Sequence, residues 1–577
     1  MSSAVESFVI KRLLIANRGE IAVRIIRACR ELGIESVAVF SAADARAVHA
    51  LAADRAVAIG PAPAAQSYLS VARLIEAAQS AGVDAVHPGY GFLSENARFA
   101  EACASAGLIF VGPPAPALAL MGSKIEARRL VASAGVPVVP GETPHDQSTK
   151  GIEAAVDRVG LPALIKASAG GGGKGMRRVA IADEVASAIE AARREALAAF
   201  GDGTLYVEKL VERPRHVEVQ VFADNAGRAV HLFERECSVQ RRHQKVIEES
   251  PSPSAPQELR ERMTSAAIAV THAVGYRNAG TVEFLVDGAS FYFLEMNTRL
   301  QVEHAVTEQV TGVDLVRAQL LVASGEPLPW TQTQITQRGH AIEARVYAED
   351  PAHGFLPQAG ALSIYVAPHM PGVRVDSGVA EGSDIPVYYD PMIAKVIATA
   401  ESRPLAIARL AAALRELRLD GVRTNVTFLI RVLELPEFRD GRIDTGFLDR
   451  EGARLAAETP AGHESPPRAS RATPRDPWDA SGTEVAGRDG GYRGGRRSAA
   501  GTEVGGHRAT LTAPMPATVI KINVATGDTV KKGEVLVLLE AMKMELPVRA
   551  PDNGTIGAIR CREGELVDAD TELLELR

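Results

Sequence analysis

A long segment without hydrophobic periodicity divides this chain into two parts that fold separately. Residues 456–508 are rich in Pro, Gly, Ser, Arg and Asp. A segment of this composition buries too little apolar surface to offset the entropy lost when its backbone becomes ordered. The sequence therefore predicts a disordered linker at 456–508, with a large folded region before it and a small domain, residues 509–577, after it.

Charge, cysteine content and hydropathy exclude several classes of function. The net charge is −7 over 577 residues, which does not suit a protein whose main surface binds nucleic acid. The four cysteines are far apart, so they fit neither a disulfide framework nor a cysteine metal site. No signal peptide and no membrane-spanning apolar run is present. We predict a cytoplasmic enzyme with no membrane or nucleic-acid partner.

The region before the linker changes its pattern near residue 205. Before that point, short apolar strands alternate with Ala-rich helical stretches, which predicts a parallel sheet covered by helices. The strands are expected at 13–16, 37–40, 56–59, 85–86 and 109–111, with an amphipathic helix at 21–32. After residue 205, alternating runs at 216–222 and 281–286 predict antiparallel strands. The large region is therefore predicted to be α/β followed by α+β.

The small C-terminal domain contains an internal repeat. Val519, Gly527 and Leu536 align at one fixed offset with Ile556, Gly564 and Leu573. Two similar strand-turn-strand halves predict a small β-sandwich with pseudo-twofold symmetry. The symmetry places the sequence Met-Lys-Met at residues 542–544 on a hairpin tip, so that Lys543 has the geometry of a swinging arm at the end of a tether.

Two further clusters in the large region suit the binding of a nucleotide and a metal. The glycines at 170–173 follow a strand that carries Lys166, and their exposed N–H groups can bind phosphate oxygens or remain a flexible loop. Glu283, Glu295 and Asn297 lie on or next to two successive strands and are hard oxygen ligands of the type that Mg²⁺ prefers. Downstream, Arg299 and Glu303 provide a fixed cation and a candidate base.

These motifs resemble two known families. The tail resembles the biotin carboxyl carrier domain, whose Met-Lys-Met tip carries biotin on its lysine; Ala517 stands where that family commonly has glycine. From about Phe8 to Arg450 the chain resembles biotin carboxylase, which has the ATP-grasp fold. The matching blocks lie at 14–22, 87–96, 121–124, 214–218, 240–245 and 295–304. The departures are Ala169, Lys174 and Tyr347, which stand where relatives often have Gly, Arg and Asn.

The resemblance implies a domain order and a set of site residues. The domains would be an N-terminal α/β domain (8–122), an ATP-grasp domain with a glycine-rich lid (123–330) and a C-terminal α+β domain (331–455). ATP would be surrounded by Lys124, Lys166, Gly172, Gly173, Glu208, Lys209, Leu210, Val211, His216, Gln240 and His243. Glu283, Glu295 and Asn297 would hold Mg²⁺ or Mn²⁺, with two ions expected. Bicarbonate would be bound by Lys245, Arg299, Gln301 and Val302.

The resemblance also implies a reaction and partners. Glu303 would deprotonate bicarbonate, which attacks the γ-phosphate of ATP to give carboxyphosphate. Arg345 would stabilise the enolate-like ureido oxygen of biotin that is attached to Lys543. A biotin-protein ligase would attach the biotin, and a separate carboxyltransferase β subunit would move the carboxyl group to acetyl-CoA or propionyl-CoA. A homo-oligomer within a larger hetero-oligomer is expected.

Two alternatives remain open from the sequence. One is an ATP-grasp ligase that acts on a different carboxylate and uses a lipoyl-type carrier. The other is a non-catalytic biotin donor or assembly scaffold with a degenerate ATP site. Bicarbonate-dependent ATP cleavage would exclude the first, and biotin-stimulated ATPase activity would exclude the second.

Overall fold

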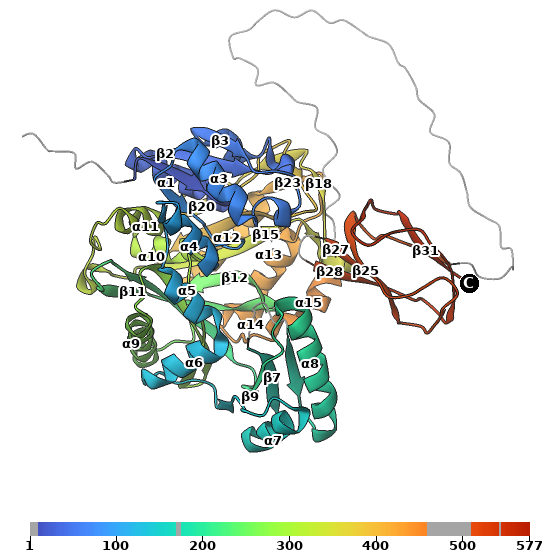
Figure 1. Cartoon of the computed structure of the whole chain (residues 1–577). Helices are drawn as coiled ribbons and strands as arrows, with labels where there is room; N and C mark the ends of the chain where they lie inside the picture. The colour runs from blue at the N-terminus through green and yellow to red at the C-terminus, as the bar shows by residue number, and fades with distance from the viewer. Residues whose placement is uncertain (1–9, 169–174, 458–508, 542–543) are drawn as a thin grey trace, which may run out of the picture. The chain divides into compact units, whose positions relative to one another are not determined.

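The computed structural model describes residues 10–168, 175–457, 509–541 and 544–577 (Figure 1). The chain divides into two compact units: a large one that ends at Ala456 and a small one that holds most of the C-terminal domain. The predicted linker, apart from its first two residues, lies outside the described residues, as do Gly172, Gly173 and Lys543.

A five-stranded parallel sheet opens the large unit, which confirms the α/β prediction. Its order is β3-β2-β1-β4-β5, and every neighbouring pair is parallel. The strands are β1 (Arg12–Ile15), β2 (Glu35–Phe40), β3 (Arg55–Ala58), β4 (Ala85–His87) and β5 (Ile109–Phe110). The first helix, α1 (Gly19–Leu32), begins two residues earlier than predicted and ends at Gly33, whose φ of 70° is readily adopted by a residue without Cβ.

Further helices accompany this sheet and connect it to the rest of the unit. They are α2 (Val48–Ala52), α3 (Val71–Ala81), α4 (Ala97–Ser105), α5 (Ala115–Gly122) and α6 (Lys124–Ser133). Asn96 and Ser123 accept hydrogen bonds from backbone N–H groups in the first turns of α4 and α6, so both helices begin at side-chain caps. Because α6 starts at Lys124, this cap places that lysine at the beginning of the helix.

An eight-stranded sheet forms the centre of the large unit. Its order is β14-β13-β10-β11-β12-β15-β22-β20, and every neighbouring pair is antiparallel. The strands are β10 (Arg215–Ala223), β11 (Ala229–Arg241), β12 (Gln244–Ser250), β13 (Asn278–Asp287), β14 (Ser290–Asn297), β15 (His340–Tyr347), β20 (Val373–Ser377) and β22 (Met392–Ala400). This confirms the predicted strands at 216–222 and 281–286. The sheet takes strands from both sides of residue 330.

Three helices lie between or beside these strands in the chain. They are α9 (Gln257–Val274), α10 (His304–Thr311) and α11 (Leu315–Ala323). The helix α10 starts directly after the predicted base Glu303. Because the first residues of a helix have fixed backbone angles, this start helps to fix the position of the preceding segment.

A smaller antiparallel sheet and two helices form the part of the unit that contains the glycine-rich segment. The sheet order is β6-β9-β7-β8, with β6 (Gly141–Glu142), β7 (Ala163–Ala167), β8 (Met176–Val179) and β9 (Leu205–Lys209). The helices α7 (Thr149–Val159) and α8 (Val185–Phe200) pack against it through Ile152, Ile165, Ile189 and Val207. The segment between β7 and β8 includes the predicted phosphate-binding glycines.

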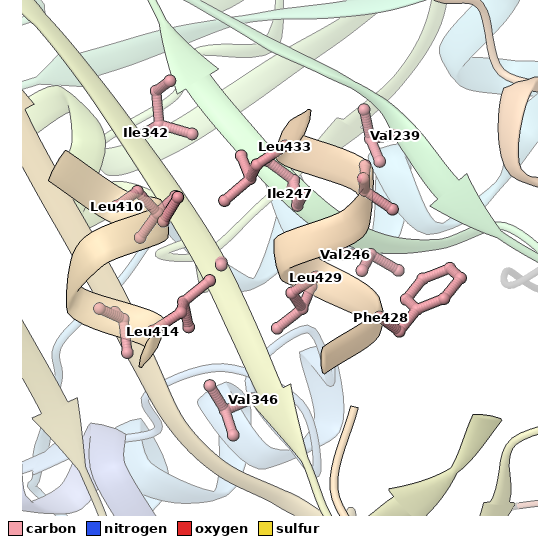
Figure 2. Close-up of a cluster of buried hydrophobic side chains, with 14 of the residues drawn as sticks. Val239, Val246, Ile247, Ile342, Val346, Leu410, Leu414, Phe428, Leu429 and Leu433 are labelled. Carbon is pink, nitrogen blue, oxygen red and sulfur yellow. The ribbon is translucent and has the colours of Figure 1, made fainter. Parts of the chain in front are cut away.

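The C-terminal part of the large unit packs two helices against the eight-stranded sheet. Figure 2 shows side chains of α12 (Arg403–Glu416) and α13 (Val426–Glu434) gathered with side chains of β11, β12 and β15. Leu410, Phe428 and Leu429 are at most 2% exposed in this cluster. The remaining elements here are α14 (Pro436–Arg439), α15 (Phe447–Ala457) and the short strands β16 (Glu349–Asp350), β17 (Leu356–Pro357), β18 (Gly360–Ala361), β19 (Ile364–Val366), β21 (Asp384–Ile385) and β23 (Arg418–Asp420).

The small unit confirms the repeat that the sequence predicts. Its two four-stranded sheets have the orders β24-β31-β29-β26 and β28-β27-β25-β30. β25 (Ala517–Ile522), β26 (Thr529–Val530) and β27 (Val535–Ala541) correspond to β29 (Gly554–Ile559), β30 (Leu566–Val567) and β31 (Glu572–Leu576), and β24 (Ala509–Thr512) and β28 (Met544–Arg549) complete the unit. Gly527 and Gly564 both have positive φ, so the repeat extends to the turns. The strand β27 ends at Ala541, and β28 begins at Met544.

Among the described residues, no helix is long and apolar enough to cross a membrane.

Leu429→Ala should destabilise the large unit because it removes a side chain with 0% exposure from the cluster in Figure 2. We expect a loss of about 2–5 kcal/mol in the free energy of unfolding. Leu405→Ala is the matched control, since Leu405 lies on α12 with 52% of its surface exposed, and should change the free energy by less than about 0.5 kcal/mol. Urea unfolding followed by circular dichroism measures both, and equal losses would contradict the packing described.

Candidate active site

One cavity in the large unit, of about 870 Å³, brings together most of the predicted site residues. The predicted residues that line it are Lys124, Lys166, Glu208, Lys209, Leu210, Val211, His216, Gln240, His243, Lys245, Glu283, Glu295, Asn297, Arg299, Gln301, Val302 and Arg345. Glu303 does not line the cavity and is 0% exposed. The sequence thus predicts a set of residues that the fold collects from the eight-stranded sheet, the smaller sheet, α6 and the loops between them.

The Lys245 ammonium group lies among three buried carboxylates. Its Nζ is 2.5 Å from Glu218, 2.9 Å from Glu283 and 2.6 Å from Glu303. Burial disfavours the charged form of Lys245, but these carboxylates raise its pKa well above the ordinary value. A second buried cation, Arg235, donates to the other oxygen of Glu218 at 2.6 Å. The arrangement keeps several charges in a site that is largely closed to water.

Glu303 is one of these three carboxylates, and it contacts two cations. One carboxylate oxygen accepts from Lys245, and the other accepts from Arg345 at 3.1 Å. Burial disfavours ionisation of Glu303, but Lys245 and then Arg345 hold the pKa of its carboxyl well below the usual range. Glu303 is therefore an ionised carboxylate at neutral pH, as a proton acceptor must be, although it reaches the cavity only through the cations that line it.

Arg345 lies on β15 and is held by a second carboxylate. Its Nε donates to Glu248 at 2.6 Å. Burial raises the pKa of Glu248 to about 7, and Arg345 opposes that rise. Tyr347, where the chain departs from the family pattern, lines the cavity near Arg345, and burial raises the pKa of its phenol. The phenol is therefore neutral at ordinary pH.

The predicted metal ligands meet on adjacent strands. Glu283 of β13 pairs in register with Glu295 of β14, and Asn297 donates from its amide to Glu283 at 2.7 Å. The pKa of Glu295 is raised by burial and then by the Glu283 carboxylate. The buried Glu283 carboxylate and the half-buried Glu295 carboxylate repel each other and, with an amide beside them, form a donor set that a divalent cation stabilises. The residues present thus fit a bound Mg²⁺.

Arg299 is oriented by the residues around it. Its guanidinium group donates to Gln301 at 2.7 Å and to Asn297 at 3.0 Å, and its Nε lies 3.3 Å from Glu95. Gln301 in turn donates to Glu283 at 2.9 Å. These contacts fix a planar cation at the wall of the cavity, next to the predicted metal ligands, where an anion can bind.

His216 also lies next to the carboxylates. The ligand atoms of His216, Glu218 and Glu283 lie within 4.8 Å of one another. Burial opposes protonation of His216, and the Glu283 carboxylate raises its pKa. The ammonium group of Lys245 already supplies positive charge to Glu218 and Glu283, so this cluster is an ion-pair network rather than a zinc site.

A tight turn carries His243 to the cavity. The strands β11 and β12 pair Gln240 with Lys245, and the turn between them consists of Arg242 and His243. Both turn residues have positive φ, 48° and 65°, as a type I′ hairpin requires. A side chain at positive φ costs free energy, and such costs are concentrated at functional sites. All four of these residues line the cavity.

Two further lysines line the cavity. Lys166 donates to Glu208 at 2.9 Å, and Arg128 also contacts that carboxylate. Burial disfavours the charged form of Lys166, but Glu208 raises its pKa. Burial lowers the pKa of Lys124, which has no carboxylate partner of comparable strength among the described residues. These cations lie near the strand ends from which the predicted phosphate-binding segment starts.

Sequence reasoning missed the functional position of three residues: Glu218, Glu248 and Glu20. Glu218 alternates with valines on β10, which predicts a solvent-exposed side chain, yet it is 0% exposed and contacts Lys245. Glu248 holds Arg345, and Glu20 on α1 accepts from the phenol of Tyr90 in the cavity wall. The role of Glu218 is indicated by its position opposite Glu283, and only the pairing of β10 with β13 reveals that position.

Family models match nearly all of the described chain. The N-terminal domain of biotin carboxylase matches residues 9–118, and the ATP-binding domain of the carbamoyl-phosphate synthase L chain matches 123–331. The C-terminal domain of biotin carboxylase matches 343–450, and the model described as biotin-requiring enzyme matches 509–576. A biotin carboxylase from Halalkalibacterium halodurans is 51% identical over 442 residues, which are 76% of this chain and 97% of that protein.

The chain belongs to the biotin carboxylase family.

Two further similar proteins support the fold and show how far the similarity extends. The biotin carboxylase domain of a 2-oxoglutarate carboxylase from Hydrogenobacter thermophilus, solved with MgADP, ADP and bicarbonate, is 41% identical with a TM-score of 0.76; the match covers 79% of this chain and all of that chain. The α subunit of methylcrotonoyl-CoA carboxylase from Glycine max is 50% identical over 76% of this chain. The match spans 60% of that relative's length.

Lys245→Met should destabilise the large unit more at pH 8 than at pH 5. The low native pKa of Glu303 stabilises the fold above the ordinary glutamate pKa, and this stabilisation is lost as the pH falls through the native value. Without Lys245, the carboxylates stay buried and uncompensated at pH 8 but can bind protons at lower pH. We expect a loss of about 3–5 kcal/mol at pH 8 and a smaller loss at pH 5.

The measurement is urea unfolding at both pH values, with Lys11→Met, which removes an exposed lysine of the same unit, as the control. A loss that does not depend on pH would contradict the role assigned to the Lys245 cluster.

Proposed function

We propose that this chain uses ATP and bicarbonate to carboxylate biotin that is attached to its own Lys543. The observation that carries the proposal is the cluster in which Lys245 and Arg345 contact the two oxygens of one buried carboxylate, Glu303. A base held between two cations that line the cavity suits the deprotonation of a small anion bound by those cations. The C-terminal carrier domain contains Lys543, to which the biotin that accepts the carboxyl group would be attached.

Biotin, ATP and Mg²⁺ are the cofactors and substrates that this proposal requires. Mg²⁺ would supply positive charge at the phosphate oxygens, and Glu283, Glu295 and Asn297 would hold it. Lys124 and Lys166 would bind the phosphates, and the other nucleotide contacts would come from Glu208, Lys209, Leu210, Val211, His216, Gln240 and His243, all of which line the cavity. Gly172 and Gly173 are assigned to the lid over the phosphates from the sequence. The finer assignment to Mn²⁺, and to two ions, is part of the same proposal.

Bicarbonate would be held and activated by a second group of residues in the same cavity. Lys245, Arg299, Gln301 and Val302 would bind the anion, and Glu303 would take its proton. The resulting oxygen attacks the γ-phosphate of ATP, which yields carboxyphosphate and ADP. The protein contributes positioning and charge neutralisation, which are the main sources of catalysis in phosphoryl transfer.

Arg345 would act in the second half of the reaction. Carboxyphosphate breaks down to CO₂ and phosphate, and the phosphate accepts the N1′ proton of biotin. Arg345 would then stabilise the negative charge that develops on the ureido oxygen. Glu248 and Glu303 hold the guanidinium group of Arg345 in place from two sides.

The chain would act as the α subunit of an acyl-CoA carboxylase, with a separate carboxyltransferase β subunit. One relative, the methylcrotonoyl-CoA carboxylase α subunit from Dictyostelium discoideum, aligns over 97% of this chain and 95% of its own length at 39% identity. That alignment spans 661 positions, more than the 577 residues here, so the relative contains residues that this chain lacks. The short predicted linker at 456–508, in place of a folded module, favours acetyl-CoA or propionyl-CoA as the acceptor.

A pyruvate carboxylase of separate subunits is the second candidate. A subunit of the pyruvate carboxylase from Methanothermobacter thermautotrophicus is 50% identical to this chain over 91% of its own length. We also propose that a biotin-protein ligase attaches the biotin and that the chain forms a homo-oligomer within a larger assembly. The proposed domain boundaries are 8–122, 123–330, 331–455, 456–508 and 509–577.

ATP hydrolysis by the purified chain, with and without bicarbonate and free biotin, tests the proposal. We expect hydrolysis to depend on bicarbonate, and the intact mass to increase by one biotin after incubation with a biotin-protein ligase. Bicarbonate-independent hydrolysis, or no hydrolysis, would contradict it. Adding purified β subunits of known acyl-CoA or pyruvate specificity then identifies the acceptor.

Glu303→Gln should lower kcat for the bicarbonate-dependent reaction by about 10²–10⁴-fold because a glutamine cannot accept the proton. The control is Glu381→Gln, which changes an exposed carboxylate in the same unit. Unaltered activity of the Glu303 variant would show that the proton goes elsewhere.

A further inference from the structure

The segment from Gln301 to Glu303 is anchored at both of its internal peptide carbonyls. Nδ1 of His304 lies 2.8 Å from the carbonyl oxygen of Gln301. Nζ of Lys395 donates to the carbonyl oxygen of Val302 at 2.5 Å. Because each peptide is planar, fixing a carbonyl also fixes the N–H on the other side of the same peptide. The two contacts therefore set the directions of the Val302 and Glu303 backbone N–H groups.

His304 is suited to this role by its burial and its surroundings. The side chain is 0% exposed at the start of α10. A carbonyl can only accept, so the proton of the neutral ring must be on Nδ1. Nε2 has no hydrogen-bond partner among the described residues. Burial, and then the cations Lys395, Arg24 and Arg374, keep the ring neutral by holding its pKa well below the usual value.

Lys395 is an unusual residue for the interior of a sheet. It lies on β22 opposite Arg345, and its side chain is 0% exposed. Glu20 of α1 lies 3.3 Å from its Nζ, and Asp376 of β20 lies 3.8 Å away. A buried ammonium group is costly unless it is paired and hydrogen-bonded. The two carboxylates balance its charge, and its short hydrogen bond goes to Val302.

Lys395 and His304 do not line the cavity, so neither is placed to touch a substrate. Both act on the three residues that include two predicted bicarbonate ligands, Gln301 and Val302, and the predicted base, Glu303. Lys395 joins this segment to α1 and β20, which come from distant parts of the chain. The carbonyls of the segment are therefore held by side chains from two elements outside it, α10 and β22.

We propose that Lys395 and His304 are positioning residues that hold Gln301, Val302 and Glu303 in the conformation that binds and deprotonates bicarbonate. This inference rests on the proposed function, since it assigns a role within the same reaction. It predicts a specific defect: bicarbonate binding should weaken, while the nucleotide wall, formed by Lys124, Lys166 and β9, stays intact.

The first test is Lys395→Met, which removes the donor and keeps the length of the side chain. We expect the KM for bicarbonate to rise by about tenfold or more, as for the loss of a charge-assisted hydrogen bond, and the KM for ATP to change by less than about twofold. The matched control is Lys11→Met, which makes the same substitution at an exposed lysine of the large unit. It should keep the bicarbonate KM near that of the wild type.

The second test uses His304 and does not require a change in the charge of the interior. His304→Leu removes the donor to Gln301, whereas His304→Asn places an amide N–H near the position of Nδ1. We expect a raised bicarbonate KM for the leucine variant and substantial rescue by asparagine. This pair tests the inference even if Lys395→Met fails to fold, which calorimetry of each variant would reveal.

The outcomes separate this inference from the proposed function. A wild-type chain whose ATP hydrolysis does not depend on bicarbonate overturns both. With a bicarbonate-dependent wild type, folded His304→Leu or Lys395→Met protein with an unchanged bicarbonate KM overturns the inference alone. An equal rise in the KM values for ATP and bicarbonate also overturns it, because a merely structural role would produce that result.

Discussion

The ammonium group of Lys245, in contact with Glu218, Glu283 and Glu303, is the interaction on which the rest of the site depends. Taking one charge out of water is expensive, and three carboxylates that share a small volume repel one another. The positive charge of Lys245 offsets this repulsion, so the three carboxylates can be buried together. Since the carboxylates come from β10, β13 and the start of α10, the same ion pairs also fix these elements relative to one another.

Further ion pairs surround Lys245 and its three carboxylates. Arg235 neutralises Glu218 from one side, and Arg345 neutralises Glu303 and Glu248 from the other. The cavity wall therefore presents cations that are already held in place, so little reorganisation is needed when an anion binds. Lys395 belongs to the next layer, where it supports a backbone carbonyl and not a substrate.

Much of the fold follows from periodicity because periodicity reports burial. The parallel strands and α1 occur where alternation of apolar runs and helices predicts them, and the repeat in the tail corresponds strand by strand to the two sheets of the small unit. Periodicity could not reveal the order of strands in the central sheet, since pairing such as that of β12 with β15 joins residues far apart in sequence. The same limit applies to Glu218 and Lys395, because their burial depends on neighbouring elements that the local pattern does not identify.

The central claim is that the chain transfers the carboxyl group of bicarbonate to biotin on its own Lys543. The most direct measurement is the fixation of ¹⁴C from bicarbonate onto the biotinylated chain in the presence of MgATP and the absence of any carboxyltransferase. The account predicts label that remains with the protein, at most one per biotin, and none in a Lys543→Arg variant. Biotinylated, folded wild-type chain that hydrolyses ATP but retains no label above the variant would contradict it.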